Sequence, residues 1–329
     1  MSMKELSMDR ICRKSYNKRD LNTIRGKGMT LQQLKYLVTV AECGSISEAA
    51  QELFISQPSL SAAIQNLEKE MGVTAFSRSS KGVVITREGE ELLAYSRMLL
   101  EQADIMQEHF GKDKNRTPKF SVSCQHYSFA VNAFVDLVKQ YDASQYNFIL
   151  RETQTGEIID DVAQGKSEVG ILYLSAHNEE VLTKLMRKNG LVFEELFVAE
   201  PHVFICREHP LANKKEITLD DLQPYPYLVY EQGERNSFYF AEEFLSMLDF
   251  PKNIQVRDRA TLFNLVIGLN GFTVCSGVID QKLNGENIIA KPLVSDCDMR
   301  IGMIRMKNTM LSRYALYYQE AIKNYLAIV

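Results

Sequence analysis

The stretch that decides the fold runs from Ser45 to Gly72 and reads SISEAAQELFISQPSLSAAIQNLEKEMG. It predicts two short amphipathic helices joined by a tight turn. Ser56 can cap the second helix, and Pro58 suits its first turn, where a missing N–H costs nothing. Gly72 can end it. Its apolar positions have the spacing of a buried stripe: Leu60, Ile64 and Leu67. The front of this helix is therefore small, polar and uncharged.

The flanking residues complete the unit. Apolar residues at 31, 34, 37, 38 and 41 predict a preceding helix that Gly44 ends. Residues 73–86 predict a short hairpin, with its turn at Lys81-Gly82. Three helices and a hairpin within residues 29–87 make a winged helix-turn-helix domain, which is otherwise all-α.

A helix-turn-helix places its second helix in the DNA major groove, where small residues allow a close approach. The Gln57 amide can pair with adenine, and serine hydroxyls can bond to either kind of base edge. Basic residues near the wing can meet phosphates. The predicted DNA contacts are Ser45, Ser47, Ser56, Gln57, Pro58, Ser59, Ser61, Gln65, Arg78, Lys81 and Arg87. The alternative is a helical hairpin that serves only in packing.

The stretch LQQLKYLVTVAECGSISEAAQELFISQPSLSAAIQNLEKEMGVTAFSRSSKGVVITREGEELL resembles the N-terminal domain of LysR-type transcriptional regulators. The resemblance rests on G-S-I-S-E-A-A, S-Q-P-S-L-S, L-E-x-x-x-G, F-S-R and I-T-x-x-G at fixed spacings. Two positions depart from the family pattern. Ala75 replaces a usual leucine, and Ala63 replaces a frequent glutamine, which puts one polar contact of that helix in doubt. The resemblance implies double-stranded operator DNA as a partner.

Residues 88–117 predict a linker: one helix reaching Gly111, then a hydrophilic hinge. Leu92, Leu99 and Met106 are seven residues apart, and Ser96, Ala103 and Phe110 follow them by four, as in a coiled-coil seam. The expected dimerisation residues are Leu92, Leu99, Ala103, Met106 and Phe110. The alternative is a helix packed on its own domain. The resemblance implies a homodimer or homotetramer, in which each dimer reads two half-sites.

Residues 118–329 alternate strands and helices, which predicts an α/β domain with a mostly parallel sheet. The expected strands include FSVSC, YNFILRE, EVGILYL, IQVRD, GFTVCSG and MRIGMIRM. The expected helices cover residues 129–141, 155–164, 238–247, 261–269 and 312–327. E-V-G-I, E-H-P-L-A and G-L-N-G-F are similar to the family's effector domain. That domain has two lobes, like type 2 periplasmic binding proteins, here about 118–200 with 293–329, and 201–292.

Ligands of open α/β sheets bind at the carboxyl ends of strands, in the crevice between lobes. Loops there that begin helices can offer N–H and hydroxyl donors to an anion, and an arginine can add a forked contact. The expected effector site comprises Gln125, His126, Tyr127, Ser128, Gln154, Thr155, Arg257, Arg259 and Thr261. We therefore expect a small anionic metabolite. The alternative is that the arginines pair with Asp258, Asp161 or other surface acids.

Composition restricts the class of protein. The chain has 329 residues, 45% hydrophobic, with a net charge of −4. Residues 1–28 carry eight Lys/Arg against three Asp/Glu and predict a disordered basic arm, so Met29 is an alternative start. Residues 118–329 carry 21 Lys/Arg against 27 Asp/Glu. This acidic part of the chain argues against non-specific binding to nucleic acid. No apolar run suits a membrane helix or signal core, and no cysteines form C-x-x-C, so we expect a cytoplasmic protein without membrane contact.

Two other chemistries are weighed. Cys206-x-x-His209 has no second ligand pair nearby in sequence for a metal, and Cys124-x-His126 would need adjacent strand positions to face each other for catalysis. We expect no metal, no cofactor and no enzymatic activity. The leading hypothesis is a DNA-binding transcription regulator controlled by a metabolite, with RNA polymerase as a further partner. The alternative is a cytoplasmic solute-binding or catalytic α/β protein whose helix-turn-helix makes protein contacts.

Overall fold

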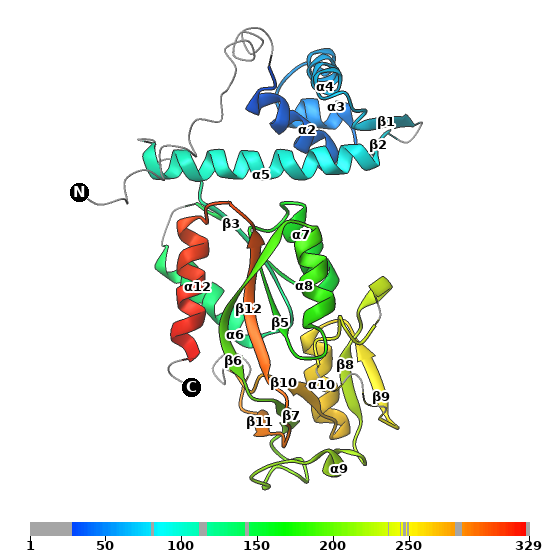
Figure 1. Ribbon diagram of the computed structural model, residues 1–329, viewed down its shortest axis with the longest axis vertical. Helices are drawn as coiled ribbons and strands as arrows, with labels where there is room; N and C mark the ends of the chain where they lie inside the picture. Colours follow the sequence, from blue (N-terminus) through cyan, green and yellow to red (C-terminus); the bar gives the residue numbers. More distant parts are fainter. Residues whose placement is uncertain are drawn as a thin grey trace, which may run out of the picture. The chain divides into compact units, whose positions relative to one another are not determined.

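The computed structural model describes residues 28–79, 82–111, 117–141, 145–235, 237–243, 245, 248, 250–279 and 285–326. The chain forms two compact units, Met1–Leu100 and Glu101–Val329. Each is described by itself below, with the elements labelled in Figure 1. The expected basic arm, residues 1–28, lies outside the described residues except for Gly28.

The first unit begins with three helices whose ends follow their capping residues. Thr30 closes a capping box at the start of the first, and Ser56 caps the third. Gly44 and Gly72 end these two helices with φ of 63° and 70°, a left-handed conformation that suits glycine. The helices are α2 (Leu31–Cys43), α3 (Ile46–Glu52) and α4 (Gln57–Met71).

A two-stranded wing follows, made of β1 (Phe76–Ser79) and β2 (Gly82–Ile85) in antiparallel register. It is tied to the turn between α2 and α3, because the Val83 amide donates to the Gly44 carbonyl at 3.1 Å. A Cβ atom at Gly82 would lie 2.7 Å from that same oxygen. The close approach therefore needs glycine at position 82.

The core of this unit draws on all three helices and the wing. Its buried residues are Leu34, Leu37, Val40, Ala49, Ala50, Leu60, Ile64, Leu67, Ala75 and Phe76. The long helix α5 (Arg87–Phe110) begins in this unit, and its last turns belong to the second. Its 24 residues would extend about 36 Å at 1.5 Å per residue.

The first lobe of the second unit is built on a five-stranded sheet with the order β4-β3-β5-β12-β6. Strands β3, β4 and β5 are parallel, but β12 runs antiparallel to both β5 and β6. The expected mostly parallel sheet is thus wrong for its second half, because β12 enters from the second lobe and runs back between its neighbours. The strands are β3 (Lys119–Cys124), β4 (Asn147–Glu152), β5 (Val169–Leu174), β6 (Leu191–Ala199) and β12 (Met299–Met306).

Helices cover both faces of this sheet (Figure 1). Helices α6 and α12 pack together on one face, and α7 and α8 cover the other. Sequence periodicity predicted all of them except α8, which is short and follows β5 closely. The helices are α6 (Ser128–Gln140), α7 (Thr155–Ala163), α8 (Glu179–Lys188) and α12 (Arg313–Leu326).

The second lobe contains a three-stranded antiparallel sheet, β10-β7-β11, and a parallel pair, β8-β9. Helix α10 packs against β7, β8 and β9. The chain enters this lobe after β6 and leaves it before β12. The elements are β7 (His202–Cys206), α9 (Leu219–Leu222), β8 (Tyr227–Tyr230), the 3-10 turn η1 (Gly233–Arg235), β9 (Asn253–Val256), α10 (Arg259–Leu269), β10 (Thr273–Cys275) and β11 (Ile288–Pro292).

The helix expected over residues 238–247 is wrong for its described part, since residues 237–243 form turns and bends. Both Glu242 and Glu243 are buried and accept hydrogen bonds from backbone amides of distant residues. Neighbouring residues of a helix point about 100° apart, so a surface helix would not bury both. Long-range pairing of these carboxylates therefore overrides the local helical pattern.

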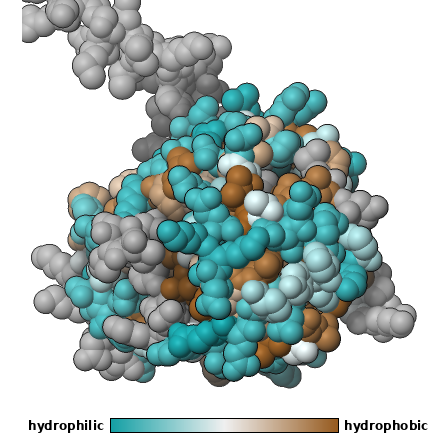
Figure 2. All heavy atoms as spheres, turned by 90° about the horizontal axis from the view of Figure 1, so that it is seen from below, coloured by the Kyte–Doolittle hydropathy of each residue, from teal (hydrophilic) through white to brown (hydrophobic). Residues whose placement is uncertain are grey.

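The one face of the molecule seen in the space-filling view is mainly polar. On the face seen in Figure 2, hydrophilic residues cover most of the described area, and hydrophobic residues form small regions among them. No helix of the described residues is both long and apolar enough to span a bilayer.

Candidate functional site

Helix α4 presents one polar face in the first unit. Gln57, Ser61 and Gln65 follow each other at intervals of four residues, so they lie along one side of the helix. Gln57 and Gln65 are exposed and Ser61 is half-buried. The buried stripe of α4 packs into the core instead. The helix thus offers amides and a hydroxyl to an external partner.

The serines at the helix starts already have a structural role. Ser56 Oγ accepts from the Ser59 amide at 3.3 Å and lies 2.7 Å from Ser59 Oγ. Ser45 Oγ accepts from the Glu48 amide at the start of α3. In Ser45 and Ser56 the cap occupies one lone pair of the hydroxyl oxygen. Each serine therefore has only its O–H and its second lone pair left for a hydrogen bond to DNA. Ser47 and Pro58 are exposed beside them.

The basic residues expected to meet phosphates are only partly described. Arg87 is exposed at the first position of α5. Arg78 lies in β1, but its side chain is outside the described part of the chain, and so is Lys81.

Helix α5 carries an exposed apolar stripe. Tyr95, Leu99, Met106 and Phe110 are 55%, 41%, 58% and 78% exposed, and their spacings of four, seven and four residues keep them on one side. Ser96, which the sequence pattern put in the seam, is instead buried and donates to the Leu92 carbonyl at 2.7 Å.

Two of the expected dimerisation residues are less exposed than the stripe. Leu92 is half-buried against the core of the first unit, and Ala103 is half-buried. The exposed apolar stripe is therefore rotated from the predicted seam, and it includes Tyr95. The sequence pattern missed Tyr95 because a strict seven-residue count began at Leu92.

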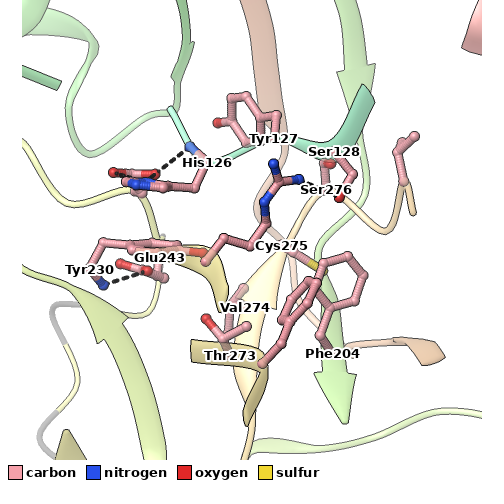
Figure 3. Close-up of a pocket in the computed structure, with 14 residues that line it drawn as sticks. His126, Tyr127, Ser128, Phe204, Tyr230, Glu243, Thr273, Val274, Cys275 and Ser276 are labelled. Carbon is pink, nitrogen blue, oxygen red and sulfur yellow. Dashed lines mark hydrogen bonds and ion pairs between the residues drawn. The ribbon is translucent and has the colours of Figure 1, made fainter. Parts of the chain in front are cut away.

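A pocket lies between the two lobes of the second unit (Figure 3). Four of the nine expected effector residues line it: His126, Tyr127, Ser128 and Arg259. Its volume is about 30 Å³, enough for one or two water molecules. The structure therefore has a nearly closed cleft, and a metabolite could enter only after side chains or lobes move.

Arg259 connects the lobes at this pocket. Its guanidinium donates to Ser128 Oγ at 3.0 Å and to Glu152 Oε1 at 2.6 Å, both in the first lobe. Arg259 is the first residue of α10, because Asp258 caps that helix two residues earlier than the sequence pattern predicted. A polar hydroxyl and a forked cation thus meet at the pocket, where an anion could replace Glu152.

His126 and Glu242 form a second connection. The His126 amide donates to Glu242 Oε2 at 2.9 Å, and His126 Nδ1 lies 3.0 Å from both carboxylate oxygens. The Tyr230 ring stacks on the imidazole at 3.9 Å with an interplanar angle of 7°. Burial lowers the pKa of His126, but the charge and hydrogen bond of Glu242 outweigh it, so this pKa is raised above its usual value.

Residues that do not line the pocket form a third connection between the lobes. Arg235 of η1 donates to the Gly156 carbonyl at 2.9 Å and to the two Asp160 oxygens at 3.1 and 2.8 Å. A Cβ atom at Gly156 would be 2.7 Å from Arg235 Cδ, so glycine is what lets the arginine reach α7.

Three other expected effector residues do not line the pocket. Gln125 and Thr155 are fully buried, and the Gln125 amide donates to Thr155 Oγ1 at 2.6 Å. Gln125 Oε1 also accepts from Tyr127 and from the Tyr173 amide, so its carbonyl oxygen is saturated within the fold. Gln154 packs beside Gly233. The sequence pattern did not distinguish these three residues from the neighbouring ones that line the pocket.

Arg257 and Thr261 are not in the pocket either. The Arg257 side chain is 81% exposed and pairs with Glu231. Thr261 donates to Asp258 through both its amide, at 2.8 Å, and its hydroxyl, at 2.7 Å. In this structure nearby acids bind the donors of Arg257 and Thr261, an arrangement of the kind that the alternative named for the arginines. A role of these two residues in effector binding stays a prediction.

The sequence interpretation missed most of the pocket wall supplied by the second lobe. These residues are Phe204, Tyr230, Glu242, Glu243, Phe263, Thr273, Val274, Cys275, Ser276 and Val278. One signal was available: Glu242 and Glu243 are adjacent acids inside the aromatic stretch FYFAEEF. Charges in such a setting are often buried with a partner.

The residues weighed as a metal site and as a nucleophile have other roles in this structure. His209 Nε2 lies 3.0 Å from the Asn270 carbonyl, and His209 Nδ1 accepts from the Leu211 amide at 3.1 Å. Burial lowers the pKa of His209, which favours the neutral ring. Cys124 is fully buried, and burial raises the pKa of its thiol well above the usual range. Among the described residues no group of three or more His, Cys, Asp or Glu could hold a metal ion.

Comparison with known proteins assigns the helix-turn-helix and the domain with the interlobe pocket to one family. Residues 31–90 match the family described as bacterial regulatory helix-turn-helix protein, lysR family, and residues 124–326 match the LysR substrate binding domain. The chain belongs to the LysR family. It is a DNA-binding transcription regulator with an N-terminal helix-turn-helix and a C-terminal effector-binding domain, as the sequence motifs predicted.

Relatives of the chain include bacterial HTH-type transcriptional regulators. The Escherichia coli regulator YnfL is 31% identical over 64% of this chain and 68% of its own. The Bacillus subtilis regulator AlsR is 27% identical over 73% and 77%. Among solved structures, a full-length OxyR variant from Pseudomonas aeruginosa has a TM-score of 0.65 at 21% identity, covering 90% of this chain and 95% of its own. CbnR in complex with its target DNA has a TM-score of 0.55 at 18% identity, covering 90% and 100%. These structures support the two-lobed α/β fold.

Proposed function

We propose that this LysR-family regulator binds operator DNA as a homodimer and that a small carboxylate-containing metabolite between its lobes changes operator binding or promoter activation. The observation that carries the effector part is Arg259, which meets Ser128 and Glu152 in the interlobe pocket. A guanidinium beside a hydroxyl is suited to a carboxylate.

The proposed switch is an exchange of partners at Arg259. A ligand carboxylate takes the place of Glu152, whose own side chain is 22% exposed and can turn to water. Because the closed pocket holds only about 30 Å³, binding needs a different arrangement of the lobes or of Arg259. The ligand can shift this equilibrium only by the difference in its affinity for the two arrangements.

The proposed DNA contacts lie on α4 and the wing. Gln57, Ser61 and Gln65 supply hydrogen bonds to base edges from one exposed side of the helix. Arg87 has an exposed cation for phosphate, and we assign Arg78 and Lys81 the same role from their place in the sequence. CbnR, a structural relative, is known in complex with its target DNA.

The proposed dimer forms through the exposed stripe of α5, which pairs with the same stripe of a second copy. A homotetramer would join two such dimers. RNA polymerase is the partner through which bound protein would affect transcription. We place the protein in the cytoplasm, where operator and polymerase are, and assign it no enzymatic activity, in keeping with the regulators to which it is related.

A matched pair of arginine variants tests the effector site. Full-length wild type, Arg259→Ala and Arg257→Ala are melted with a panel of small carboxylates. A ligand at 100 times its Kd adds about 2.7 kcal/mol of stability. We expect Arg257→Ala to respond like wild type, because its guanidinium is outside the pocket. Arg259→Ala should lose about 10- to 150-fold in affinity. Equal responses of the two variants would contradict the site.

A further inference from the structure

The second-lobe wall of the interlobe pocket has two buried polar atoms without a hydrogen-bond partner among the described residues: Glu243 Oε2 and Thr273 Oγ1. Their residues are only 1% and 4% exposed, and both line the pocket. Buried polar atoms in native proteins nearly always have partners, so two such atoms in one pocket wall point to a missing polar group. The hydroxyl of Thr273 can donate or accept, whereas the carboxyl of Glu243 can only accept once it is ionised.

The acidic side chains at this pocket differ in whether a cationic side chain pairs with them. Glu242 accepts from His126 twice, and Glu152 pairs with Arg259. Glu243 accepts from the Tyr230 amide at 2.9 Å through Oε1, but no cation pairs with it within the described part of the chain. Burial raises the pKa of Glu243 well above its usual value, and neighbouring Glu242 adds to the rise. The raised pKa favours the neutral carboxyl of Glu243 when the site holds no cation. A cationic donor beside Glu243 would lower this pKa, favour the carboxylate and supply the missing hydrogen bond.

The rest of the wall restricts the ligand further. Phe204, Phe263, Val274 and Val278 give the pocket an apolar side. In Figure 3, Ser128 lies across the view from Glu243, with Thr273 and Val274 below. Ser128 and Arg259 line the same pocket as Glu243 and Thr273, so a ligand whose carboxylate is held by the first two could present another polar group to the second pair.

We propose that the effector is an α-amino acid with an apolar side chain, whose ammonium group is held by Glu243 and Thr273 while its carboxylate is held by Arg259 and Ser128. The inference rests on the proposed function, because it assumes that the effector binds in this pocket. It also narrows that function, since a simple anion would add negative charge beside Glu242 and Glu243 and would leave Glu243 Oε2 and Thr273 Oγ1 unpaired.

The test compares ligands that differ by one group, using calorimetric titration of the full chain. The probes are L-phenylalanine, 3-phenylpropanoate and 2-phenylethylamine, and L-leucine with 4-methylpentanoate. We expect each amino acid to bind about 10- to 150-fold more tightly than the acid without its ammonium, the ratio for one hydrogen bond to a charged group. Phenylethylamine should bind weakly, since it leaves Arg259 paired with Glu152.

Variants then test which residues make the protein prefer the amino acid over the acid that lacks its ammonium group. Glu243→Gln and Thr273→Val should bring the ratio between amino acid and acid close to one, while the acid itself binds as in wild type. This ratio does not depend on overall stability, so it remains readable if a variant melts earlier. Glu180→Gln and Thr183→Val, on the outer surface of α8, are matched controls and should keep the wild-type ratio.

The contradicting results are distinct. A ratio near one in wild type, or a ratio unchanged in Glu243→Gln and Thr273→Val, would overturn the ammonium site and leave only an internal water as the partner of these atoms. The proposed function would still stand if Arg259→Ala lost affinity for the acid probes, 3-phenylpropanoate and 4-methylpentanoate. Binding of every probe unchanged in Arg259→Ala would overturn the pocket itself. No binding of any amino acid at millimolar concentration would reject this ligand class.

Discussion

His126 Nδ1 lies 3.0 Å from both carboxylate oxygens of Glu242, and the two side chains are almost completely buried where the first lobe meets the second. The pair joins residues 116 positions apart in the chain. Since each partner comes from a different lobe, we expect the charge of His126 to be coupled to the closure of the cleft.

This coupling predicts a pH dependence. The pKa of His126 is raised in the folded protein, so its contribution to stability is complete below the unfolded pKa of about 6.5 and is lost as pH rises through the folded value. Glu242→Gln removes the partner and should cost up to about 3–5 kcal/mol at acid pH. The difference in unfolding free energy between wild type and variant should shrink as pH rises from 5.5 through the raised pKa of His126. A constant difference up to alkaline pH would contradict this titration of His126.

The DNA-binding face of α4 predicts a change in specificity. Gln57→Ala should cost about 1–3 kcal/mol at one or two positions of an operator selected from random DNA, because one amide would lose its base contact. Arg87→Ala should instead weaken binding to all sequences and reduce the salt slope by about one unit. The measurement is a gel-shift series on single-base operator variants. Uniform weakening by Gln57→Ala would contradict its place in the groove.

Phe54 predicts a stabilising substitution. It lies in the turn between α3 and α4 with φ of 54° and is 94% exposed, so it has a left-handed backbone and little packing. Asparagine tolerates this conformation better than phenylalanine. Phe54→Asn should therefore raise the unfolding free energy of the first unit by about 1 kcal/mol. Denaturant titration gives the value, with Phe54→Ala as the control for the lost ring. A destabilised Phe54→Asn variant would mean that the ring is packed in the assembled protein.

The stripe on α5 predicts an oligomer that a single charge can break. Met106→Asp would place an unpaired carboxylate in the proposed seam, at a cost of several kcal/mol. Gln107→Asp puts the same charge on the next residue, about 100° around the helix, and serves as the control. Sedimentation should show smaller species for Met106→Asp only. If both variants sediment like wild type, the subunits associate elsewhere.

The sequence predicted the elements that local signals define. Ser56 at the start of α4 and Gly72 at its end are capping residues that act within one turn, so a linear reading finds them. The same holds for the loop at His126–Ser128, which follows a strand and begins a helix. The family motifs at residues 44–89 are likewise local in sequence.

Features set by distant residues could not be predicted in this way. Arg257 and Arg259 are two residues apart and chemically identical, yet only Arg259 reaches Glu152, because α10 begins at that position. Glu243 and Thr273 meet the pocket from separate segments of the second lobe. Strand β12 runs antiparallel because it returns from the other lobe, a matter of topology that residue pattern does not encode.

The central claim is that Arg259 couples a ligand between the lobes to operator contact by the first unit. The most direct measurement is a DNase I footprint of the full chain on its selected operator, with and without the carboxylate that most stabilises the protein. The account predicts that this ligand changes the protected region for wild type and for Arg257→Ala. Arg259→Ala should protect the same DNA without ligand and show no change when ligand is added. A footprint that ligand leaves unaltered in wild type, or alters equally in Arg259→Ala, would contradict the claim.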